Sequence, residues 1–312
     1  MHKLQLLAFA LAAIVAAGCN SPTDAGGLPA QRGDGPIKVT ATIGMIADIA
    51  AIVGGEHVVV TGLMGPGVDP HLYKATQGDL VKLSGADVIF YNGLHLEGRM
   101  ADVLVQMASR VKTVQVTETV PHDLLREPPE FQGQYDPHVW FDVSMWKYSV
   151  ERIRDEYKDM DPAHAAEYDA NAEAYLKEMD TLHAYAKEQI ATIPKERRVL
   201  VTAHDAFGYF GRAYDIEVMG LQGISTAAEY GLQDVDRLVD QIVARKIRAV
   251  FVESSISPKS IEALVTGAQS RGHNLVVGGE LFSDAMGQPG TPDGTYLGMV
   301  RHNVDTIAKA LK

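Results

Sequence analysis

The sequence has 312 residues, and 28 lysines and arginines face 40 aspartates and glutamates, so the formal charge is −12. A hydrophobic share of 46% and a charged share of 22% are typical of globular proteins and exclude a disordered or fibrous chain. The acidic balance argues against a nucleic-acid partner, which requires a basic face. The single cysteine excludes a disulfide framework. The length permits one large domain or two domains of about 150 residues each.

The first 18 residues have the pattern of an export signal. Lys3 provides a positive start, residues 4–15 are mostly apolar, and small residues follow. This apolar stretch is too short for a comfortable transmembrane span. The end of the segment resembles the processing site of bacterial lipoproteins, although Ala16 stands where leucine is usual. We therefore predict a signal peptide over 1–18 and a lipid on Cys19; the alternative is a plain secretory signal with a free cysteine.

The segment that follows is rich in glycine, proline, aspartate and serine and contains little to bury. We expect residues 19–36 to be a flexible tether between the lipid and a globular body. Several acyl chains together hold a protein on a bilayer, whereas one chain does so only marginally. The sequence thus predicts an extracytoplasmic (periplasmic) protein that is lipid-anchored to a bacterial membrane.

The body alternates short apolar runs with helical patterns. Several runs are apolar throughout, as in strands of a parallel sheet that helices cover on both faces. The expected strands are 37–43, 57–63, 87–92, 113–116, 198–203, 216–221, 248–254 and 274–279. The expected helices between them include 76–84, 98–109, 233–246 and 258–271. This alternation predicts an α/β fold with parallel sheets and right-handed crossovers.

One long helical pattern interrupts the alternation at 161–194. Asp161 is a good N-cap, Pro162 suits a first turn and Pro194 ends the run. A mostly apolar stripe at spacings of four and three contains Tyr168, Ala172, Tyr175, Met179, Leu182, Ala186 and Gln189. About 30 residues extend roughly 45 Å, which is longer than one lobe needs. We predict a stiff connector; an ordinary core helix or a helix pair is the alternative.

This connector divides the body into an N-terminal α/β lobe over 37–160 and a C-terminal α/β lobe over 195–312. Two identical tripeptides lie in the first lobe, at 69–71 and 136–138, and each reads Asp-Pro-His. Proline fixes its own φ and extends the residue before it, so each histidine should sit on a rigid turn. The aspartates either accept the second ring N–H of the histidine or only shape the turn.

Four dispersed residues follow or end expected strands and are spaced 67, 66 and 80 residues apart: His71, His138, His204 and Asp284. Each interval is about two βα units, so all four side chains could meet at strand ends in a cleft between the lobes. A lone histidine at a strand end is more often structural, but this matched set is not. Three imidazoles and a carboxylate suit Zn²⁺, or Mn²⁺ if the carboxylate binds through both oxygens. We predict one metal ion per chain.

Other polar residues are expected to have supporting or structural roles. Glu253 ends a strand near the expected cleft and is interpreted as a supporting carboxylate rather than a ligand. His95 and Glu97 are interpreted as turn and packing groups. The other histidines of the globular body show no convergent pattern and are expected to be surface or structural: His57, His122, His164, His183, His273 and His302.

Longer stretches of the sequence resemble a known family. They include DPHLYKATQGD, DPHVWFD, TAHDAFGYFGRAY and GGELFSDAMG. The chain resembles the TroA-like zinc/manganese-binding lipoproteins (cluster A-I), the solute receptors of metal-ion ABC importers, from residue 37 almost to its end. The resemblance implies two lobes joined by a rigid helix, the same four metal ligands, and an ABC permease with its ATPase as partners.

The resemblance leaves the metal open between zinc and manganese. Manganese-selective members often carry a carboxylate at the third ligand position, whereas this chain has His204, like the zinc-binding members. Many dedicated zinc receptors also carry a histidine-rich loop, but residues 118–135 contain only His122.

The leading hypothesis is a monomeric receptor, not an enzyme, that captures Zn²⁺ or Mn²⁺ and delivers it to an ABC importer. The alternative is a secreted zinc-dependent hydrolase with the same site, since catalytic zinc commonly keeps three protein ligands and a water. No HExxH motif is present, and only Glu253 could serve as a general base. A surface adhesion protein would leave the four-ligand set unexplained.

Overall fold

The computed structural model describes residues 35–131 and 133–312. The predicted signal peptide, Cys19 and nearly all of the predicted tether therefore lie outside the described residues. In the part of the chain that is described, no helix has the length and apolar character needed to cross a membrane.

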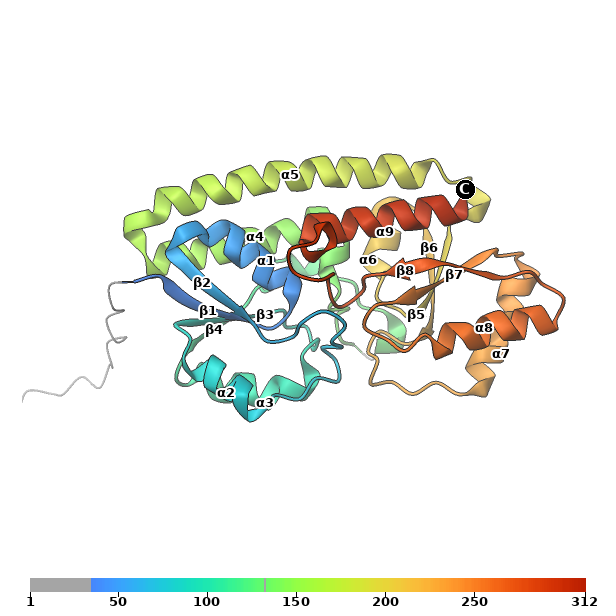
Figure 1. Cartoon of the computed structure of the whole chain (residues 1–312), viewed down its shortest axis with the longest axis horizontal. Helices are drawn as coiled ribbons and strands as arrows, with labels where there is room; N and C mark the ends of the chain where they lie inside the picture. Colours follow the sequence, from blue (N-terminus) through green and yellow to red (C-terminus); the bar gives the residue numbers. More distant parts are fainter. Residues whose placement is uncertain (1–34, 132) are drawn as a thin grey trace, which may run out of the picture. The chain divides into compact units, whose positions relative to one another are not determined.

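The first lobe is built on a four-stranded parallel sheet with strand order β2-β1-β3-β4. Its strands are β1 (Ile37–Ala41), β2 (Val58–Gly62), β3 (Val88–Tyr91) and β4 (Lys112–Gln115). Its helices are α1 (Gly44–Gly54), α2 (Gln77–Ser84), α3 (Ala101–Ala108) and α4 (Val143–Met160). In Figure 1, α1 and α4 lie on one side of the sheet and α2 and α3 on the other. Most residues of β1 and β3 are accordingly buried.

The second lobe contains two parallel strand pairs, β5–β6 and β7–β8, and β5 contacts β7. Its strands are β5 (Val199–His204), β6 (Glu217–Gln222), β7 (Ala249–Glu253) and β8 (Val276–Leu281). Its helices are α6 (Gly208–Tyr214), α7 (Leu232–Ala244), α8 (Lys259–Ser270) and α9 (Tyr296–Leu311). The predicted α/β class with parallel sheets is confirmed, and a strand occurs in each of the eight predicted runs.

Short 3₁₀ turns complete the described secondary structure: η1 (Gly55–His57), η2 (Gly98–Met100), η3 (His122–Leu124), η4 (Pro129–Phe131), η5 (Val139–Phe141), η6 (Pro162–His164), η7 (Lys195–Arg197) and η8 (Pro292–Gly294). One predicted helix start is visible in full at α2. Thr76 Oγ1 accepts a hydrogen bond from Asp79 N (3.2 Å), and Asp79 Oδ2 accepts one from Thr76 N (2.9 Å). This reciprocal capping box satisfies two backbone N–H groups at the helix start.

The long helix α5 (Ala165–Ala191) contains 27 residues and follows the turn η6. It contacts α1 and α4 of the first lobe and α6 and α9 of the second, and Figure 1 shows it running beside α9. At about 1.5 Å per residue, it is about 40 Å long. The structure thus contains the predicted long helix that lies along both lobes.

The buried stripe of α5 follows the prediction except at its last position. Ile190 is buried where the 4-3 spacing had placed Gln189, which is only partly buried. A straight helix turns once per 3.6 residues, so a strict seven-residue spacing drifts by about 20° per heptad. Over three heptads this drift moves the buried position on by one residue.

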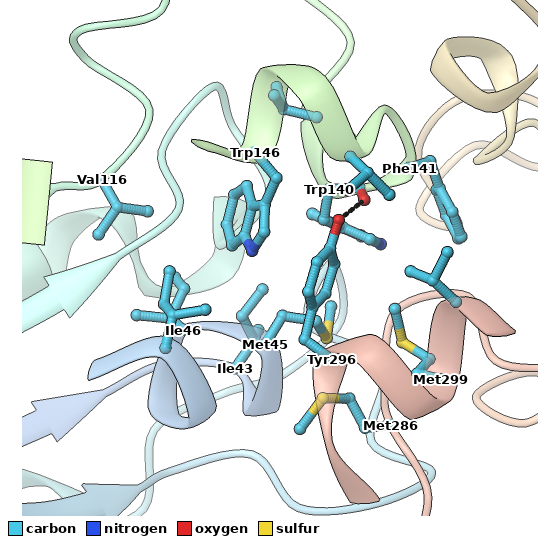
Figure 2. Close-up of a cluster of buried hydrophobic side chains, with 14 of the residues drawn as sticks. Ile43, Met45, Ile46, Val116, Trp140, Phe141, Trp146, Met286, Tyr296 and Met299 are labelled. Carbon is cyan, nitrogen blue, oxygen red and sulfur yellow. Dashed lines mark hydrogen bonds between the residues drawn. The ribbon is translucent and has the colours of Figure 1, made fainter. Parts of the chain in front are cut away.

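An apolar cluster connects the two lobes. A single group of buried side chains extends from the first sheet through α4 and α5 to α9. Figure 2 shows its centre, where Trp140 and Trp146 of the first lobe lie near Tyr296 of the second. The Tyr296 hydroxyl donates a hydrogen bond to the Trp140 carbonyl (2.8 Å). The lobes are therefore joined by packing as well as by the connecting helix.

We expect Met179→Ala to lower the free energy of unfolding by about 2–5 kcal/mol, because its side chain is fully buried on α5 and its loss leaves a cavity. Chemical denaturation would measure the change. Glu188→Ala, at an exposed position of the same helix, should change stability by no more than about 0.5 kcal/mol. Equal effects of the two substitutions would contradict the assigned packing.

Candidate metal centre

Two loops of the first lobe present His71 and His138. His71 lies between β2 and α2, and His138 lies directly before η5. In each tripeptide the aspartate accepts a hydrogen bond from the histidine backbone: Asp69 Oδ1 from His71 N (2.9 Å) and Asp136 Oδ1 from His138 N (3.0 Å). Aspartates commonly shape turns through such bonds to the residue two positions later. Both histidines are thereby held on similar turns.

The two aspartates differ in their second contact. Asp136 Oδ1 also lies 2.8 Å from His138 Nδ1 and holds the ring. Asp69 Oδ2 instead accepts a hydrogen bond from Thr226 Oγ1 (2.7 Å), a residue of the second lobe. The buried His71 Nδ1 has no hydrogen-bond partner among the described residues. Asp136 thus contacts the second ring nitrogen of its histidine, whereas Asp69 only shapes the turn and contacts the second lobe.

Strand ends of the second lobe position the other two residues. His204 is the last residue of β5, and Asp284 follows β8 by three residues. Glu253, the last residue of β7, accepts hydrogen bonds from His204 N at Oε1 (2.9 Å) and contacts His204 Nδ1 through Oε2 (2.6 Å). Both Glu253 oxygens therefore contact His204, which agrees with the supporting role expected for Glu253 from the sequence.

The four side chains meet at one point between the lobes, and their ligand atoms all lie within 4.8 Å of one another. His71 Nε2 is 3.2 Å from His138 Nε2 and 3.6 Å from Asp284 Oδ2. Asp284 Oδ1 is 3.4 Å from His138 Nε2, and Oδ2 is 3.3 Å from His204 Nε2. Ligands about 2.0 Å from a tetrahedral zinc ion are separated by about 3.3 Å. The observed separations are close to this value.

Burial makes these atoms costly unless a cation binds them. The four side chains are at most 1% exposed. Both Asp284 carboxylate oxygens and His204 Nε2 have no hydrogen-bond partner in the described part of the chain. Buried polar atoms are normally hydrogen-bonded, and an unpaired buried charge is strongly unfavourable. The donor set and its unsatisfied atoms therefore fit a divalent metal ion.

Burial and neighbouring charges set the protonation of the metal-free centre. Burial lowers the pKa of His71 to about 3. Burial also acts to lower the pKa of His138, but Asp136 and Asp284 outweigh it and raise that pKa to about 9. For His204, Glu253 and Asp284 outweigh burial and hold the pKa well above its usual range. Both raised pKa values favour the protonated imidazoles in the metal-free centre, so protons compete with a metal ion for these nitrogens.

The remaining residues singled out in the sequence lie elsewhere. Glu97 is buried and accepts hydrogen bonds from Thr42 Oγ1 (2.7 Å), Asn92 N (2.7 Å) and Gly93 N (3.1 Å), so it organises the loop after β3. His95 lies in that loop with φ = 67°. Both have the turn role that was expected.

Two contributors were missed by the sequence analysis. Trp140, two residues after His138, packs edge-on against its ring at 5.2 Å and donates a hydrogen bond from Nε1 to Ser283 O (3.1 Å). Thr226 holds Asp69. Trp140 had a signal, its place beside a predicted ligand, whereas Thr226 had none, because its contact joins residues 157 positions apart.

Two α/β lobes joined by a long helix, with a buried three-histidine, one-carboxylate centre between them, define a two-lobed metal-binding protein. Residues 39–310 match the family described as zinc-uptake complex component A, periplasmic, and the chain belongs to this family.

Relatives cover nearly the whole chain. The manganese-binding lipoprotein MntA of Bacillus subtilis is 50% identical, with all of both chains covered. The zinc-binding protein TroA of Treponema pallidum is also 50% identical, with 93% of each chain covered. The solved structure of that periplasmic zinc-binding TroA superimposes with a TM-score of 0.87 at 50% identity, covering 89% of this chain and 99% of TroA. Two equally similar relatives are thus named for different metals.

The support of His204 by Glu253 can be tested directly. Glu253→Gln should lower the pKa of His204 in the metal-free protein, because the carboxylate that stabilises the imidazolium is removed. An NMR titration of the ring nitrogens would measure it. The control is Glu217→Gln on β6, which removes an exposed carboxylate paired with Arg245. It should leave the pKa of His204 unchanged. An unchanged titration in Glu253→Gln would contradict the assigned contact.

Proposed function

We propose that the protein is an extracytoplasmic receptor that binds one Zn²⁺ or Mn²⁺ ion through His71, His138, His204 and Asp284 and delivers it to an ABC permease driven by its ATPase. The observation that carries this proposal is the convergence of four buried side chains from both lobes, whose ligand atoms all lie within 4.8 Å of one another. The family and the names of the relatives support a metal cargo.

The four side chains could bind either zinc or manganese. Three imidazoles and one carboxylate oxygen provide the four nitrogen and oxygen ligands that zinc prefers. Asp284 Oδ1 faces His138, and Oδ2 faces His71 and His204. Both carboxylate oxygens are therefore directed into the centre, which gives the additional oxygen ligand that suits manganese.

The arrangement supports capture rather than catalysis. A catalytic metal needs a position open to water and substrate, but here all four donors come from the protein and are at most 1% exposed. The candidate general base of the hydrolase alternative, Glu253, is engaged with His204 through both oxygens. The relatives are named as binding proteins, and we propose no enzymatic activity.

We further propose the anchoring and organisation expected from the sequence. Lipid on Cys19 would hold the protein at a bacterial membrane, with residues 19–36 as the tether; several relatives are named lipoproteins. We also propose that the lobes comprise residues 37–160 and 195–312 and that residues 161–194 connect them. We expect the receptor to act as a monomer.

Metal binding to this centre should stabilise the fold by mass action. We expect one ion bound at this centre in each chain, and zinc at 100 times the Kd of the centre should raise the free energy of unfolding by about 2.7 kcal/mol. In His138→Ala and Asp284→Ala, most of this stabilisation should be lost. Thermal unfolding with and without metal, together with metal analysis, would measure both quantities.

His122→Ala serves as the matched control, because it removes an exposed imidazole and should retain the full stabilisation. If both centre variants kept the stabilisation of the unsubstituted protein, the site assignment would be wrong. Metal-dependent turnover of a peptide, amide or phosphate ester would instead support the hydrolase.

The affinity should fall as pH falls, because protons on His138 and His204 compete with the metal. The sequence alone suggests weakening below about pH 6, near the reference histidine pKa. Since the pKa of His138 is raised to about 9, we now expect weakening throughout the range from pH 8 to 6. Each displaced proton should weaken binding by about tenfold per pH unit. Competition with a chelator of known pH dependence would measure it, and a constant affinity would contradict the assigned protonation.

A further inference from the structure

A second group of potential metal ligands lies on the first lobe. His57 ends η1, His164 ends η6, and Glu167 lies in the first turn of α5. One ligand atom from each lies within 4.8 Å of the other two. His57 and His164 showed no convergent pattern in the sequence and were expected to be surface or structural; each does contact a carboxylate at a partly exposed position, but no sequence pattern indicated that they lie together. They are 107 positions apart and meet only because α5 begins beside the turn before β2.

The two imidazoles are arranged face to face. Their ring centroids are 3.8 Å apart and their planes differ by 19°. Tyr168 packs edge-on against the His57 ring at 5.8 Å. Glu167 Oε2 lies 2.8 Å from His57 Nε2. A carboxylate and two imidazoles thus lie together, and the Tyr168 ring packs against one of the imidazoles.

A buried carboxylate orients the second imidazole. Asp161 Oδ2 lies 2.7 Å from His164 Nδ1 and also accepts a hydrogen bond from the Tyr168 hydroxyl (2.9 Å). When Nδ1 donates to this carboxylate, the neutral ring keeps Nε2 as its lone-pair nitrogen. Metal-bound histidines usually donate their other ring N–H in this way. The same arrangement holds His138 and His204 in the buried centre.

Exposure distinguishes this cluster from the buried centre. The side chains of His57, His164 and Glu167 are 24%, 40% and 63% exposed. Water can therefore reach an ion here and complete its coordination, and the side chains can adjust without repacking a core. Three protein ligands with water access provide a weaker site than four enclosed ligands.

We propose that His57, His164 and Glu167 form a second, surface-exposed site for one borderline divalent cation such as Zn²⁺, bound by two ring nitrogens, one carboxylate oxygen and water. Asp161 orients His164 from behind. Imidazole nitrogen favours zinc over manganese, so this site should take Zn²⁺ under conditions in which Mn²⁺ occupies only the buried centre.

The test is a zinc titration of the full chain in which the buried centre is disabled by His138→Ala and Asp284→Ala. We expect this double variant to bind one zinc ion and the unsubstituted protein two. Adding His57→Ala should abolish the remaining binding, and adding Asp161→Asn should weaken it by about 10–100-fold. Equilibrium dialysis with metal analysis would measure stoichiometry and affinity, and zinc X-ray absorption of the double variant should show two imidazole ligands.

Two controls keep the outcome interpretable. Glu167→Gln changes an exposed side chain that no packing depends on, so the variant should fold normally and bind zinc at least about tenfold more weakly. Adding His122→Ala, at an exposed histidine outside the cluster, should change nothing. The proposal is overturned if the double variant binds no zinc, or if His57→Ala and Glu167→Gln leave its binding intact.

This result is separable from the function proposed above. If the buried centre were misassigned, His138→Ala with Asp284→Ala would still bind two zinc ions, and His57→Ala would remove one of them. A Mn²⁺ titration adds an independent check, because the unsubstituted protein and His57→Ala should each bind one manganese ion with the same affinity.

Discussion

The structure depends on a carboxylate, Asp284, that is buried among three imidazoles with neither oxygen hydrogen-bonded within the described chain. Such a group is unfavourable in a protein interior unless positive charge compensates it. The neighbouring carboxylates raise the pKa values of His138 and His204 and so favour protons that provide that charge, and a divalent ion in the centre would provide it as well. The strand ends of the second lobe and the rigid turns of the first hold the four groups close enough for this exchange.

The imidazoles are not held equally. Carboxylates fix the rings of His138 and His204 through Nδ1, at 2.8 and 2.6 Å. No carboxylate contacts Nδ1 of His71 among the described residues; its aspartate accepts a hydrogen bond from the His71 backbone and contacts Thr226 of the other lobe. An identical tripeptide thus orients a ring in one loop and joins the two lobes in the other. His71 is therefore the one imidazole of the centre whose second ring nitrogen is not held by a carboxylate of the described chain.

Local patterns allowed much of this to be predicted from sequence. Apolar runs predicted the strands, and the Thr76–Asp79 pair marked the start of α2. The repeated tripeptides, together with spacings of about two βα units, selected the four residues that meet between the lobes. The helices named from the sequence did not include α1, α4, α6 and α9; of these, α1 follows Ile43, which provides no side-chain cap. Contacts between distant segments also had no local signal: the bond from Thr226 to Asp69 and the stacking of His57 on His164 depend on the assembled fold.

The continuous apolar cluster around Trp140 and Tyr296 has a consequence for cargo exchange. Separating the lobes like the halves of a clamshell would expose this cluster to water, at a cost of about 25 cal/mol for each square ångström of apolar surface. Turning a single side chain and shifting its loop avoids that cost. The buried cluster therefore opposes a wide separation of the lobes.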